Sequence, residues 1–123
     1  MASDRKTIGI TPAGARTLDS LVLAGHFPSE MDAAKFAMAH ALATNATPGS
    51  VDGAVTKWNV GTFDGDGTLR SVLEALLPNE EEPYRLLEQL INEGLRLLDS
   101  ADLAPDVAGL ILSLSSTTPE AAI

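Results

Sequence analysis

Apolar and polar residues alternate near the start of the chain. In Lys6–Thr11, Ile8 and Ile10 point to one side of an extended segment, and the residues between them point to the other. This pattern predicts a short β-strand. A lone strand leaves its backbone N–H and C=O groups unpaired, so we expect it to pair with another strand, for example its own copy in a second chain.

Helical spacing replaces the alternation after this strand. The pair Thr11-Pro12 is typical of a helix start, because Thr can cap a helix and Pro is tolerated in the first turn; this helix is expected to end near Ala24. Ser29 is expected to cap a second helix at Glu30–Thr44. The second helix is apolar on opposite faces, which is more surface than one small chain easily covers. It therefore predicts self-association.

The second half of the chain follows a turn-rich stretch at Asn45–Gly53. Its patterns predict an extended segment at Ala54–Phe63 and helices at Leu69–Leu77, Pro83–Leu98 and Ala104–Leu114. The expected fold is mainly α, with a short N-terminal strand, two helices, and a helical C-terminal part that contains one further strand. We divide it into an oligomerisation unit at 1–46, an acidic helical part at 47–114 and a polar tail at 115–123.

The two halves of the chain differ in net charge. The chain has 123 residues and a net charge of −9, but residues 1–46 contain four acidic and four basic side chains, so the excess lies in residues 47–123. A neutral front half can approach a polyanion, and the acidic half would be repelled by one. The chain has no cysteine, which favours a reducing cytoplasm, and it has no apolar run long enough to span a membrane.

The first 38 residues of this pattern, Arg5–Leu42, resemble the ribbon-helix-helix family, and in particular its antitoxin type. In such proteins a strand precedes a Leu-Val-x-x-Gly-x-aromatic turn, which is followed by a Ser and an acidic residue that open an Ala-rich helix. The matching positions in this chain are Leu21, Val22, Gly25, Phe27, Ser29 and Glu30.

The resemblance implies a dimer in which two strands form a ribbon that enters the DNA major groove. It implies DNA contacts from the outward residues of the strand and from the basic residues before it, namely Arg5, Lys6, Thr7, Gly9 and Thr11. The oligomer interface is expected to include Ile8, Ile10, Phe36, Ala37, Met38 and Leu42. Gly9 has no side chain to read a base, which favours an alternative without DNA binding.

The segment FDGDGTL at Phe63–Leu69 permits three interpretations. It matches the first motif of haloacid-dehalogenase-type phosphatases, but that chemistry needs a doubly wound sheet and a later Lys, and no Lys follows Lys57. It half-matches a calcium loop, but Leu73 occupies the position of the bidentate Glu. We interpret it as a turn in which Thr68 caps the next helix.

The expected function is that of a non-enzymatic, cytoplasmic oligomer without cofactor or metal. It would contact DNA through its N-terminal ribbon and a partner protein through its acidic C-terminal helices, as antitoxin-type regulators do. The alternative is a small structural or adaptor subunit of a bacterial multi-protein assembly, such as a defence or DNA-modification complex, that makes protein contacts only.

Overall fold

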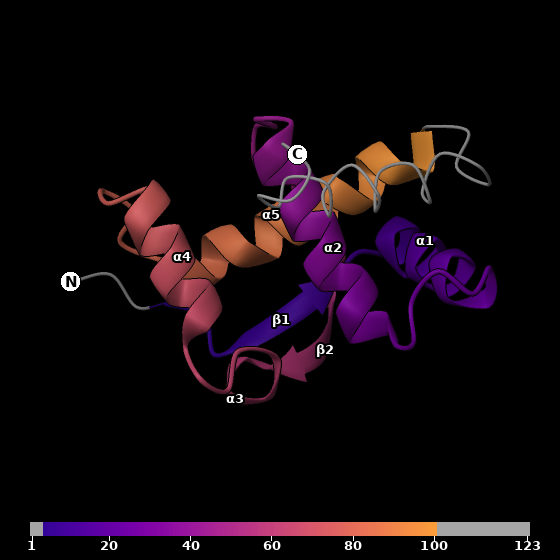
Figure 1. Ribbon diagram of the computed structural model, residues 1–123, viewed down its shortest axis with the longest axis horizontal. Helices are drawn as coiled ribbons and strands as arrows, with labels where there is room; N and C mark the ends of the chain where they lie inside the picture. The colour runs from indigo at the N-terminus through magenta and orange to yellow at the C-terminus, as the bar shows by residue number, and fades with distance from the viewer. Residues whose placement is uncertain (1–3, 101–123) are drawn as a thin grey trace, which may run out of the picture.

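Helices dominate the structure, a computed structural model that describes residues 4–100 (Figure 1). Within these residues the elements are β1 (Thr7–Ile10), α1 (Pro12–Leu23), α2 (Glu30–Ala43), β2 (Val55–Asn59), α3 (Val60–Phe63), α4 (Thr68–Leu76) and α5 (Pro83–Ser100). The predicted mainly α fold with a short N-terminal strand is confirmed. The helix expected at Ala104–Leu114 and the tail at 115–123 lie outside the described residues.

The two strands form an antiparallel pair within one chain. Thr7 lies opposite Asn59 and Ile8 lies opposite Trp58, with an irregularity between Ile8 and Gly9. The further strand expected at 54–63 is therefore present, but it is shorter than expected, because Val60–Phe63 turns into the short helix α3. β1 thus finds its strand partner in β2 of the same chain.

The other edge of β1 lies against α5, whose polar side chains take the place of a third strand. The Glu88 carboxylate accepts the backbone N–H of Gly9 at 2.7 Å. Asn92 accepts the N–H of Thr11 at 3.0 Å and donates to the C=O of Gly9 at 3.1 Å. Both edges of the strand are therefore engaged inside the chain, which satisfies backbone groups that would otherwise be buried without partners.

The Ala-rich helix α2 crosses α5 at very short range. An alanine Cβ built at Gly94 of α5 would lie 1.9 Å from the carbonyl oxygen of Ala37 in α2, so the two backbones are in direct contact there. The buried face of α2 consists of Ala33, Ala34, Ala37, Met38 and Ala41. Small side chains permit this approach, and α5 supplies much of the cover that the sequence suggested a second chain would provide.

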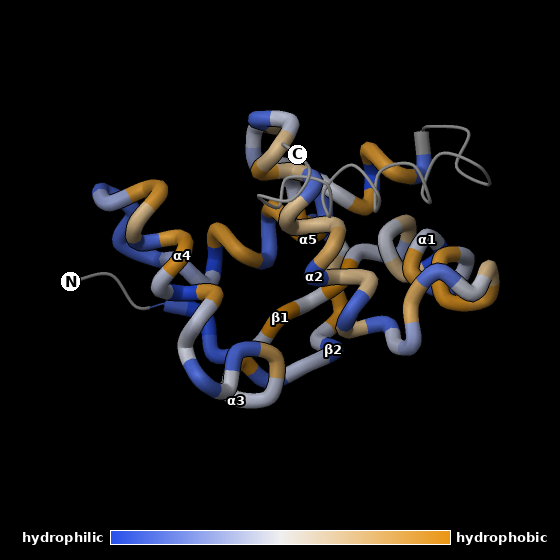
Figure 2. The backbone as a smooth tube through the Cα atoms, viewed as in Figure 1, coloured by the Kyte–Doolittle hydropathy of each residue, from blue (hydrophilic) through white to orange (hydrophobic). Residues whose placement is uncertain are grey.

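One core joins the two halves of the chain. The β1–β2 pair and the α2–α5 crossing both extend across the predicted boundary after residue 46, and buried apolar residues from both sides form one cluster. Asp4 adds a third link: its carboxylate accepts the N–H groups of Tyr84 at 2.9 Å and Arg85 at 3.0 Å, and so caps the start of α5. Figure 2 shows apolar segments of β1 and α5 side by side at this core.

Candidate partner-binding groove

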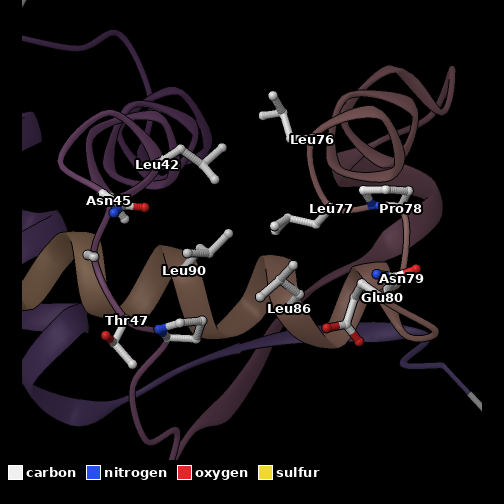
Figure 3. A pocket seen from close by; sticks show the side chains of 13 residues that line it. Leu42, Asn45, Thr47, Leu76, Leu77, Pro78, Asn79, Glu80, Leu86 and Leu90 are labelled. Carbon is white, nitrogen blue, oxygen red and sulfur yellow. The ribbon is translucent and has the colours of Figure 1, made fainter.

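An apolar groove lies between α2 and α4, with α5 as its floor (Figure 3). Its volume is about 800 Å³, which is within the usual range of binding pockets. Leu42 and Leu77 face each other across the groove, and Leu86 and Leu90 rise from α5 between them. The remaining lining residues are Ala41, Asn45, Ala46, Thr47, Pro48, Leu76, Pro78, Asn79 and Glu80.

The α4 wall of the groove exposes large apolar side chains. α4 is amphipathic, but only Leu73 of its apolar face is buried. Val72 is 40% exposed, Leu76 is 58% exposed and Leu77, directly after the helix, is 41% exposed. Isolated exposed leucines are common, whereas neighbouring ones beside an apolar cavity are typical of an interaction surface.

The FDGDGTL segment fixes the position of α4. The buried Asp64 carboxylate accepts the backbone N–H groups of Leu69 at 2.9 Å and Arg70 at 3.0 Å, which are two of the donors that the first turn of a helix leaves free. It also accepts the Tyr84 hydroxyl at 2.9 Å, which ties α4 to α5. Burial, together with this hydrogen bond to a carboxylate, raises the pKa of Tyr84 to about 12.

The expected cap of α4 needs a correction. Thr68 is the first residue of the helix, and the cap position is taken by Gly67, whose φ of 73° is left-handed and suits glycine. Gly67 has no side chain, so Asp64 reaches back to supply the acceptor that was assigned to Thr68. Asp66 in turn accepts the N–H of Thr68 at 3.0 Å. Both acids of the motif thus have a helix-starting role.

The mouth of the groove is acidic at one end. Glu80 belongs to the lining, and Glu81 and Glu82 follow it before α5 begins. Glu82 pairs with Arg85 at 3.4 Å. Within residues 4–100, Glu80 and Glu81 form no ion pair with a basic side chain.

The residues predicted to contact DNA lie in and beside β1, and several of them already have partners within the chain. The Arg5 guanidinium pairs with Glu88 at 3.1 Å and its side chain is 45% exposed, and Lys6 is exposed. Thr7 is half-buried, Gly9 is buried against α5, and the Thr11 hydroxyl accepts the N–H of Gly14 as the cap of α1. The structure therefore brings Arg5, Gly9 and Thr11 together along α5.

The residues predicted to form the oligomer interface divide into three groups. Ile8, Ile10, Ala37 and Met38 are buried in the core of the single chain. Phe36 is half-buried, with its ring between Phe27 at 5.2 Å and His40 at 6.3 Å. Leu42 lines the groove. Burial lowers the pKa of His40.

Sequence reasoning missed the residues that hold β1 on α5. Glu88 is fully buried, and among the described residues its Oε1 atom has no hydrogen-bond partner. A buried Glu in an otherwise amphipathic helix has no local signal, because its partners, Arg5 and Gly9, lie about eighty positions earlier. The groove was missed for the same reason, since its walls come from three separate helices.

Between residues 4 and 100, no group of three His, Asp or Glu side chains is arranged to hold a metal ion. Over that range, no helix combines the length and the apolar character needed to cross a lipid bilayer.

Comparison of the chain with protein-family models, with curated proteins and with solved structures found no match. The ribbon-helix-helix resemblance of residues 5–42 stays a prediction.

Proposed function

We propose that the chain is a non-catalytic adaptor that holds a segment of a partner protein in the groove between α2 and α4. The observation that carries this proposal is the exposure of Leu76 and Leu77 beside Leu42, Leu86 and Leu90. Covering these side chains removes apolar surface from water, which is the main driving force of association. Aliphatic anchors around a pocket are a common centre of a protein interface.

The rigidity of the walls supports the same function. α2 is held on α5 by the Ala37–Gly94 contact, and α4 is held on α5 by Asp64 and Tyr84. A pre-formed groove costs little ordering entropy when a partner binds. The engagement of both Asp64 oxygens in α4 and Tyr84 also supports a structural role for the FDGDGTL segment.

The test is retention of a partner from cells that express the chain. Leu76→Arg would put a charge into the groove, and Leu23→Arg is its matched control, because Leu23 is 87% exposed on α1 and does not line the groove. We expect the wild type and Leu23→Arg to retain the same protein and Leu76→Arg to lose it. Retention by all three would refute a role for the groove.

DNA contact through Arg5 and Lys6 is the second candidate, taken from the family resemblance. The observation that favours it is the exposure of both side chains at the start of β1. Contacts to phosphates release counterions, so binding would weaken steeply with salt, and Arg5→Ala with Lys6→Ala would flatten that dependence. Absence of binding to duplex DNA at low salt would exclude this candidate.

A further inference from the structure

We propose that the groove takes an amphipathic helix of a different protein, and that this helix carries Lys or Arg beside its apolar anchors. This inference rests on the proposed adaptor function and names the partner's chemistry.

The walls of the groove favour a helix over an extended segment. An extended segment that binds by strand addition needs a free strand edge to satisfy its backbone N–H and C=O groups. No residue of β1 or β2 lines the groove, and both edges of β1 are engaged, by β2 and by Glu88 and Asn92. The groove is instead bounded by helices and lined by leucine side chains, as Figure 3 shows. A helix satisfies its own backbone and offers apolar side chains at i, i+3/i+4 and i+7 to such a groove.

The charge at the mouth selects a basic helix. Glu82 is neutralised by Arg85, and Glu74 on α4 is neutralised by Arg70. In the part of the chain that the structure describes, neither Glu80 nor Glu81 has a basic partner. The Glu80 carboxylate accepts the backbone N–H of Glu82 at 3.1 Å and keeps its charge, and Glu81 is exposed next to the groove lining. Lys or Arg on the rim of an incoming helix would complement these two carboxylates, which raises the rate of association and disfavours acidic competitors.

The same charge argues against two other occupants. Residues 101–123 of this chain contain three acidic residues and no Lys or Arg. A second copy would bring its own Glu80–Glu82 run and a net charge of −9. Both would place like charges at the acidic mouth, which is unfavourable. The occupant that complements the groove therefore belongs to another protein.

The experiment uses two synthetic helical peptides of about 18 residues, close to 27 Å long. Both carry Leu at i, i+3/i+4 and i+7, and they differ only in Lys or Glu at the flanking positions. Binding of each labelled peptide to the full chain is measured by fluorescence anisotropy. We expect the Lys peptide to bind about tenfold more tightly than the Glu peptide at low salt, with the difference shrinking as salt is added.

Variants locate the binding. Leu76→Asp should abolish binding of the Lys peptide, and Leu23→Asp should leave it unchanged. Glu80→Lys combined with Glu81→Lys should reverse the preference between the peptides, and Asp52→Lys, outside the groove lining, should not. All of these positions are exposed, so circular dichroism should show unchanged folding.

The outcomes separate this inference from the adaptor function. Equal binding of both peptides that Leu76→Asp abolishes would overturn the basic helix and leave the adaptor in place. If neither peptide binds, but the cellular partner is still lost on Leu76→Arg, the basic helix would again be overturned and the adaptor function would stand. Binding that survives Leu76→Asp would overturn both. A dimer that light scattering detects and Leu76→Asp dissociates would assign the groove to a second copy and overturn the inference.

Discussion

Replacing Gly94 with alanine tests the contact between α2 and α5. In an ordinary helix interior the change stabilises by about 1 kcal/mol, because alanine loses less backbone entropy than glycine. Here the new Cβ would lie 1.9 Å from the Ala37 oxygen and 2.5 Å from its carbonyl carbon, where ordinary contacts begin at 3.4 Å. Backbone atoms cannot rotate away, so the helices must separate by more than 1 Å. Overpacking of this kind costs about 1–3 kcal/mol.

Gly61 is the matched control for this substitution. It lies in α3. A Cβ built there has no atom within 4 Å apart from its chain neighbours and the nearby backbone of its own helix. We expect Gly61→Ala to be neutral or slightly stabilising, and Gly94→Ala to lower the free energy of unfolding by about 1–3 kcal/mol. In a domain of this size, each kcal/mol corresponds to roughly 4–8 °C in Tm.

Urea and thermal unfolding followed by circular dichroism would measure both variants. A Gly94→Ala protein as stable as the wild type, or more stable, would show that α2 and α5 do not approach so closely in solution. It would also remove the explanation of why α2 is rich in alanine. Equal losses in both glycine variants would assign the effect to alanine itself rather than to the contact.

Three further predictions concern polar groups. Glu88→Ala should cost about 1–3 kcal/mol in urea unfolding, because it leaves the buried N–H of Gly9 without an acceptor; a loss well below this range would show that the bond is dispensable. Tyr84 is the only tyrosine, so phenolate absorbance after a rapid pH jump should give a pKa of about 12 in the folded state, and Asp64→Asn should lower it; an unchanged value would refute the hydrogen bond. Burial lowers the pKa of His40 below 6.5, so the folded state binds a proton at this side chain less readily than the unfolded state does. The free energy of unfolding should therefore be unaffected by His40 above pH 6.5 and should fall as the pH drops below 6.5. His40→Gln should weaken that fall.

Local sequence signals predicted the elements well. The Thr11 hydroxyl caps α1 at Gly14, the Ser29 hydroxyl caps α2 at Asp32, and Gly25 takes a φ of 83° after α1. Each of these depends on residues within a few positions of one another, so a single stretch contains the whole signal. The strand at Val55–Asn59 was also predicted, although its alternation did not show where α3 would begin.

Distant pairs could not be predicted in this way. The apolar faces of α2 indicated that it needed cover, but nothing local showed that Gly94 of α5 would supply the contact. The polar partners of β1 and the Asp4 cap of α5 join residues about eighty positions apart. The groove depends on how three helices are placed, and only part of its wall, Leu42, was singled out from the sequence.

The bonds between β1 and α5 have a consequence for biosynthesis. Asp4, Gly9 and Thr11 find their partners 79 to 83 residues later, so they stay unsatisfied while most of the chain is being translated. β1 can form its hydrogen bonds with α5 only after α5 has left the ribosome. Contacts so distant in sequence slow folding. A premature stop before residue 88 would release a product in which β1 could still pair with β2 but would lack both of its polar partners on α5.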